Sequence, residues 1–237
     1  MFGSRVLMTF VLLAGVATAF CLGGPDPRTA SGQLAACGGA ASWKGVGYLE
    51  FEVRVKTTAD LGSTSSYRWD RTHGYLRAAM PSATGTKLDA AIDVGSKSGG
   101  AWEDGAQLSG KKLGKAVNWA LQRFTEDLMW LVFPLDWGAL GVTVKPLPDV
   151  AGEGGVASPA VEVRSGAGTW RVTLDPATGR IRRTVLTRDG TAMTVTWDDW
   201  RAHGGVFFAH KRTVAETGET VEVEVIQALP EAPANVF

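Results

Sequence analysis

The feature that most constrains the fold is a helical segment at residues 117–142 that begins amphipathic and becomes apolar on all sides. One face carries apolar residues at helical spacing, namely Val117, Ala120, Leu121, Phe124, Leu128, Leu131 and Val132. Arg123, Glu126 and Asp127 are predicted on the opposite face. Residues 129–133, MWLVF, are all apolar, and Pro134 ends the helix. Such a helix needs a large apolar surface to lie against.

Most of the remaining sequence alternates between apolar and polar residues with the period of a β-strand. In residues 48–55, for example, Leu49, Phe51 and Val53 lie on one side, and Glu50 and Glu52 lie on the other. Segments of this kind, separated by Gly-rich turns, predict about eleven antiparallel strands, with the helix inserted between two runs of them. Residues 29–41 are predicted to form a first, short helix, and residues 149–158 a Gly-rich loop.

Clean alternation means that one face of the sheet is buried and the other is wet. A sheet of ten or eleven strands curls, so its concave face must be filled by helices or by a ligand. We therefore predict a mainly β protein, with a strongly curved antiparallel sheet that forms an incomplete barrel. Two helices accompany the sheet, and the longer one lies on the concave face. The alternative is a closed, lipocalin-like barrel with the helix outside.

The first 19 residues have the features of a signal peptide. Arg5 precedes an uncharged apolar run at residues 6–19, which ends in Ala17-Thr18-Ala19, a small-x-small cleavage pattern. The run is too short to span a bilayer comfortably, although an uncleaved anchor remains the alternative. We predict a leader at residues 20–31 and a single domain at residues 32–237. The expected location is the periplasm of a Gram-negative-type envelope.

Both cysteines lie close to this start. Cys21 is a candidate for lipidation, which would anchor the exported protein to a membrane. Cys37 follows Leu34-Ala35-Ala36, a better lipidation signal that stands too far from the apolar run. A disulfide between the two cysteines is the remaining alternative. The chain has no CxxC motif, which argues against structural zinc and thiol redox chemistry.

The balance of charges and the positions of the polar residues argue against several functions. Basic and acidic residues balance at 24 each without a basic stripe, which argues against nucleic acid as a partner. His73 and His203 fall in turns and His210 in a strand, at spacings that do not suit a metal. Because no nucleophile, base and orienting group can be recognised together, we expect neither an enzyme nor a cofactor. We expect a monomer.

Four places in the chain resemble the LolA/LolB superfamily of exported lipoprotein carriers, and within it a little-characterised branch. These are Cys37-Gly38-Gly39 with Trp43, Leu49 and Phe51; Trp130-Leu131 with Pro134 and Gly141-Val142; residues 170–174 with Asp175-Pro176 and Thr178-Gly179; and Asp199-Trp200-Arg201 with Gly204-Gly205 and the ending Asn235-Val236-Phe237. The resemblance implies an incomplete antiparallel barrel, helices that act as a lid, and an apolar cavity that holds acyl chains.

Nine tryptophans and nine phenylalanines exceed what a thin sheet needs, so the inward-facing aromatics are the candidate site. The residues predicted to line a ligand cavity are Leu49, Phe51, Val53, Trp69, Leu128, Trp130, Phe133, Trp170, Val172, Met193, Val195 and Trp197. Core packing explains the same residues equally well. We therefore expect a non-enzymatic carrier or sensor of lipid or lipoprotein acyl chains in the cell envelope. The alternative is a structural or assembly protein of the envelope, with the same fold, a filled core and other envelope proteins as partners.

Overall fold

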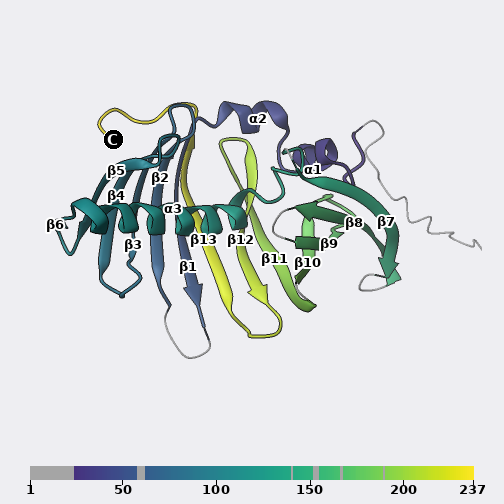
Figure 1. The fold of residues 1–237 in the computed structure, drawn as a ribbon. Helices are drawn as coiled ribbons and strands as arrows, with labels where there is room; N and C mark the ends of the chain where they lie inside the picture. Colours follow the sequence, from purple (N-terminus) through teal and green to yellow (C-terminus); the bar gives the residue numbers. More distant parts are fainter. Residues whose placement is uncertain (1–23, 58–61, 140, 152–154, 166–167, 189) are drawn as a thin grey trace, which may run out of the picture.

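The computed structural model describes residues 24–57, 62–139, 141–151, 155–165, 168–188 and 190–237. These residues form one 13-stranded antiparallel sheet that does not close into a barrel, together with three helices (Figure 1). The prediction of a mainly β protein with a curved, open antiparallel sheet is confirmed. The predicted signal peptide, residues 1–19, and Cys21 lie outside the described residues.

The sheet is built from two meanders that meet in its middle. The elements are α1 (Ala30–Ala36), α2 (Ala40–Gly45), β1 (Tyr48–Lys56), β2 (Thr64–Asp70), β3 (Tyr75–Pro81), β4 (Lys87–Asp93), β5 (Ser98–Glu103), β6 (Ala106–Gln107), α3 (Gly110–Val132), β7 (Thr143–Ala151), β8 (Ala157–Ser165), β9 (Gly168–Leu174), β10 (Ile181–Arg188), β11 (Thr191–His203), β12 (Val206–Val214) and β13 (Thr220–Leu229). The strand order is β6-β5-β4-β3-β2-β1-β13-β12-β11-β10-β9-β8-β7.

This order makes β6 and β7 the two edges of the sheet, although they are consecutive strands in the chain. The segment that joins them must therefore cross from one edge to the other. Its helix, α3, has 23 residues and is about 34 Å long at 1.5 Å per residue. Figure 1 shows α3 lying across the concave side of the sheet, as predicted.

Helix α3 lies chiefly over β4 and β5, where the sheet presents small side chains. Ala78, Ala90 and Ala101 are paired side by side on β3, β4 and β5, and all three are buried. Because side-chain size sets the distance between packed elements, this alanine row lets α3 approach the sheet closely. The indole of Trp119 donates a hydrogen bond of 3.1 Å to the carbonyl of Pro81 and fixes the helix over the β3–β4 hairpin.

Glycines explain why the helices begin and end where they do. Helix α3 starts at Gly110, earlier than predicted, because residues 110–116 carry two glycines and three lysines that hide the apolar pattern. The predicted first helix is divided into α1 and α2 at Gly38 and Gly39, which both have positive φ angles. A Cβ atom at Gly38 would lie 2.0 Å from the carbonyl oxygen of Gly205, so only glycine fits there. The structure therefore has three helices where two were predicted.

The strand count exceeds the predicted number for local reasons. The segment predicted as one strand at residues 100–108 turns at Asp104 and Gly105, which have positive φ angles, and divides into β5 and β6.

Strand β7 continues to Ala151, into the segment predicted as a loop. Its prolines, Pro146 and Pro148, are tolerated because β7 is an edge strand, and they protect that edge from pairing with another chain.

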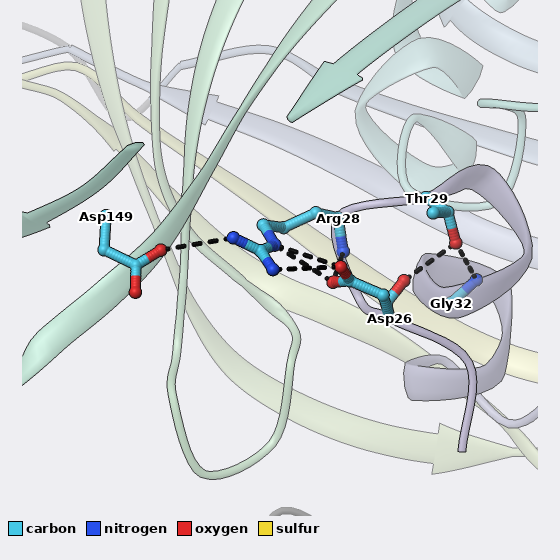
Figure 2. A network of polar contacts seen from close by, with 5 residues as sticks. All are labelled: Asp26, Arg28, Thr29, Gly32 and Asp149. Atoms are coloured by element: carbon cyan, nitrogen blue, oxygen red, sulfur yellow. Dashed lines mark hydrogen bonds and ion pairs between the residues drawn. The ribbon is translucent and has the colours of Figure 1, made fainter. Parts of the chain in front are cut away.

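The end of the predicted leader belongs to the folded domain. The guanidinium of Arg28 forms ion pairs with Asp26 at 3.0 Å and with Asp149 of β7 at 3.5 Å (Figure 2). The hydroxyl of Thr29 accepts a hydrogen bond from the backbone N–H of Gly32 and donates one to the carbonyl of Asp26, which caps α1. These contacts attach the start of α1 to the β7 edge. Each exposed ion pair contributes less than about 1 kcal/mol.

We expect the substitution Ala90→Leu to destabilise the protein by about 1–3 kcal/mol, because the added atoms fall beneath α3 in a closely packed core. The matched control is Ala91→Leu on the same strand. Ala91 lies on the other face of the sheet and is only partly buried. Urea denaturation measures both variants. Equal free energies of unfolding for the two would contradict the close approach of α3.

Candidate functional site

The concave side of the sheet holds two clusters of buried apolar residues. The first cluster lies between β1–β5, β12, β13 and α3, and the second lies between β8–β12 and the residues that follow α3. Of the predicted cavity residues, the first cluster includes Leu49, Phe51, Val53, Trp69 and Leu128, and the second includes Phe133, Trp170, Val172, Met193, Val195 and Trp197. Trp130 packs against both clusters and joins them.

The second cluster is organised around Phe133, at the end of α3. Its ring lies 4.9 Å from Trp170, 5.8 Å from Trp197 and 6.1 Å from Trp137, measured between ring centroids. Trp130 lies 6.2 Å from Trp197. Aromatic pairs of this kind contribute about 0.5–1.5 kcal/mol each beyond their buried area. The C-terminal end of α3 is thus held to the sheet by rings that pack in tilted and edge-to-face arrangements.

A continuous apolar row runs across the sheet beside these rings. The strand register pairs Val144, Val163, Trp170, Leu186 and Met193 in turn, from β7 to β11. Val163 and Trp170 are buried, whereas Val144, Leu186 and Met193 are only partly buried. This part of the concave face therefore has incompletely covered apolar side chains at its rim.

Helix α3 is fixed to the sheet in its C-terminal third by a buried polar contact. The hydroxyl of Tyr67 on β2 donates a hydrogen bond of 2.6 Å to Asp127, and Arg123 lies 3.3 Å from the same carboxylate. Asp127 was predicted on the polar face, but only 2% of it is exposed. Its place is explained by spacing, since Val117, Ala120, Phe124, Asp127 and Leu131 follow at intervals of three and four along the buried stripe.

A second charged group lies buried in the sheet itself. Arg212 on β12 is 0% exposed, and its backbone is paired with Trp197 on one side and Val221 on the other. The guanidinium carbon lies 4.7 Å from the centre of the Trp197 ring. None of its three nitrogens has a hydrogen-bond partner in the part of the chain that the structure describes. Burial lowers the pKa of Arg212 to about 9.

Arg212 was not among the predicted site residues, although the strand pattern contained a signal. It has the same parity as Val206, Phe208 and Val214, all buried, and so occupies an inward position of its strand. A charged residue at an inward position is expected to have a partner or a function.

Two of the histidines form a small polar group beside Phe208 of the first cluster. The Nε2 atoms of His203 and His210 lie 3.1 Å apart, and His210 lies 3.4 Å from Glu224. Burial lowers the pKa of both imidazoles, which favours their neutral form. His73, in the turn between β2 and β3, lies 2.8 Å from Asp70. No cluster of three or more metal-ligating side chains occurs among the described residues.

Cys37 has a packing role in the structure. Its side chain is buried in the first cluster at the end of α1, and burial raises its pKa to about 12. A thiol in this environment is unreactive. Among the helices that the structure describes, none is long and apolar enough to cross a lipid bilayer.

The sequence matches no protein-family model, and no curated protein gives a significant match. Membership of the LolA/LolB superfamily therefore stays a prediction. The candidate site is defined by geometry alone: it is the concave face, with its two apolar clusters and two buried charged groups.

We expect Tyr67→Phe to lower the free energy of unfolding by about 1–3 kcal/mol, because it removes the hydrogen bond to the buried carboxyl of Asp127. Tyr75→Phe is the matched control, since Tyr75 is 46% exposed. Its effect should stay within about 0.5 kcal/mol. Urea denaturation gives both values. A neutral Tyr67→Phe would show that this contact does not fix α3.

The Asp127 carboxyl also predicts a pH dependence. Burial raises its pKa above the ordinary value of 3.8, although Tyr67 and Arg123 oppose the shift. Above that ordinary value the folded state binds more protons than the unfolded state, so this group contributes less stability as pH rises. The free energy of unfolding of the wild type, minus that of Asp127→Asn, should therefore fall between about pH 4 and pH 7. Denaturation curves across this range measure the difference, and a rising difference would contradict the assignment.

Proposed function

We propose that this protein is a non-enzymatic carrier or sensor of an amphiphile, such as a lipid or the acyl chains of a lipoprotein. The ligand would lie between the C-terminal end of α3 and the second half of the sheet. The observation that carries the proposal is the partly buried apolar row beside this end of the helix, at Val144, Leu186 and Met193. The same rim includes Met129 and Phe133.

The way α3 is held suggests which part of it moves. The N-terminal part lies over the alanine row, and Tyr67 holds the C-terminal third at Asp127. Beyond Asp127 the contacts of α3 with the second cluster are apolar, chiefly the rings of Trp130 and Phe133. An acyl chain offers the same kind of contact, since burying a large apolar side chain contributes about 1.5–3 kcal/mol. A chain of several methylenes can therefore replace these rings.

The proposed location is the cell envelope. It rests on Arg5, the apolar run at residues 6–19 and the Ala17-Thr18-Ala19 pattern. The LolA/LolB resemblance points to the same place and to acyl chains as cargo. An open sheet with a helix tethered at both edges suits a carrier, because the helix can shift without leaving the sheet.

The alternative is an assembly protein of the envelope that uses this fold with a filled core. The complete burial of Leu49, Phe51 and Val53 in the first cluster favours it. Partners would then bind the outer face, where a hollow of about 550 Å³ is lined by Trp102 and by charged side chains that include Arg77. The two functions differ in whether an amphiphile reaches the concave face.

Quenching by dibrominated stearate tests this difference, because bromine atoms quench the fluorescence of tryptophans that they contact. We expect quenching of the purified mature protein. The fraction of the tryptophan fluorescence that is quenched should fall in Trp130→Phe, because this variant lacks a fluorescent side chain beside the proposed site. It should rise in the matched variant Trp102→Phe, since Trp102 lies on the outer face and emits unquenched.

Native mass spectrometry of the purified protein provides an independent measurement of bound lipid. Saturable quenching that depends on Trp130 supports the carrier. An unquenched protein with no bound lipid would exclude it and favour the assembly protein. Quenching that depends on Trp102 alone would place the ligand on the outer face and would also contradict the proposal.

A further inference from the structure

We propose that Arg212 binds the carboxylate head group of a single-chain amphiphile, whose chain lies against the aromatic rings at the end of α3. This inference rests on the proposed function and identifies the class of ligand. The observation behind it is a fully buried guanidinium that has no hydrogen-bond partner among the described residues.

A guanidinium is an unusual group to leave unpaired in a core. It carries five N–H donors in a fixed fork, and every one of them is hydrogen-bonded in water. Buried charges are normally paired, because burial without a partner is strongly unfavourable. The stacking of Arg212 on Trp197 offsets part of this loss but satisfies none of the donors. A carboxylate would satisfy two of them at once, since the fork matches its two oxygens.

The register shows that the neighbours of Arg212 do not provide such a group. Across the sheet, its row contains Trp197, Val221 and Val55. Val214, two residues further along β12, is also buried in the second cluster. The indole N–H of Trp197 already donates to the hydroxyl of Thr184 at 3.0 Å. The residues paired with Arg212 across the sheet are therefore apolar, which suits an acyl chain, and none of them provides an anion.

A second orphaned donor lies beside the same rings. The indole N–H of Trp137 is buried with no hydrogen-bond partner among the described residues, and the Trp137 ring lies 6.1 Å from Phe133. Phe133 in turn packs on Trp197, which packs on Arg212. Indole N–H and guanidinium groups can only donate hydrogen bonds. The guanidinium of Arg212 and the indole N–H of Trp137 thus both require a hydrogen-bond acceptor, and a carboxylate is such an acceptor.

Access explains why the anion should carry a chain. Arg212 is fully buried against Trp197, and Trp197 is itself buried and packs against Trp130 and Phe133 at the end of α3. An anion reaches the guanidinium only when these rings move aside. A small anion cannot replace the apolar contacts that these rings lose when they move, whereas an acyl chain can replace them. The structure therefore favours a fatty-acid-like ligand over a free anion.

Calorimetric titration of the mature protein with three probes tests the inference: oleate, oleyl alcohol and acetate. Oleate should bind the wild type at least about tenfold more tightly than oleyl alcohol, because hydrogen bonds to a charged group are worth about that factor or more. In Arg212→Met, oleate should bind only as tightly as oleyl alcohol, whose own affinity should be unchanged. Acetate alone should not bind.

Arg201→Met is the matched control. Arg201 lies on the neighbouring strand, is half-exposed and pairs with Asp199, so its loss should leave the oleate affinity unchanged. If Arg212→Met does not fold, the comparison of oleate with oleyl alcohol on the wild type decides alone. Equal affinities for these two probes would overturn the role of Arg212 and leave the carrier intact. Binding of acetate as tight as that of oleate would overturn the amphiphile. Binding of neither long-chain probe would overturn the proposed function as well.

Discussion

The structure depends on one constraint of connectivity: the consecutive strands β6 and β7 are the two edges of a 13-stranded sheet. The chain between them must cross the sheet, and its apolar stripe selects the concave face for the crossing. Helix α3 is therefore a cover that is tethered at both ends. The same arrangement leaves β6 and β7 as the only edges of the described sheet, and they are blunted by the shortness of β6 and the prolines of β7.

The two halves of the cover differ in how they meet the sheet. Over β3–β5, alanines bring the helix close to the strands, and Tyr67 holds Asp127 in the core. Over β8–β11, the helix ends and large rings pack against the sheet. Close packing resists motion because each displaced atom loses contacts. A stack of rings above a partly exposed apolar row exchanges contacts more readily, which is why the ligand is proposed at that end.

Much of this fold could be predicted from residue periodicity. Alternation identified most strands, and the spacing from Val117 to Leu131 identified α3 and its buried stripe. The start of α3 could not be predicted, because Gly110 and Gly114 are poor helix formers that lysines surround. The predicted cavity residues are buried on the concave side or pack there, yet their division into two clusters depends on how far the sheet curls. Curvature accumulates over many strands, and periodicity does not report it.

The charged residues buried on the concave side were harder to predict, because a polar residue at an inward position interrupts the apolar pattern. Asp127 and Arg212 both occupy such positions. The structure treats them differently: Tyr67 and Arg123 contact Asp127, whereas the guanidinium of Arg212 lies over a ring and has no hydrogen-bond partner among the described residues. Replacing buried charged groups with well-packed apolar residues is often neutral or stabilising, so a buried charge is weak evidence for a role in stability. Asp127 is explained by the attachment of α3. For Arg212 the fold offers no such explanation, and a ligand that completes its hydrogen bonds is the explanation that fits its surroundings.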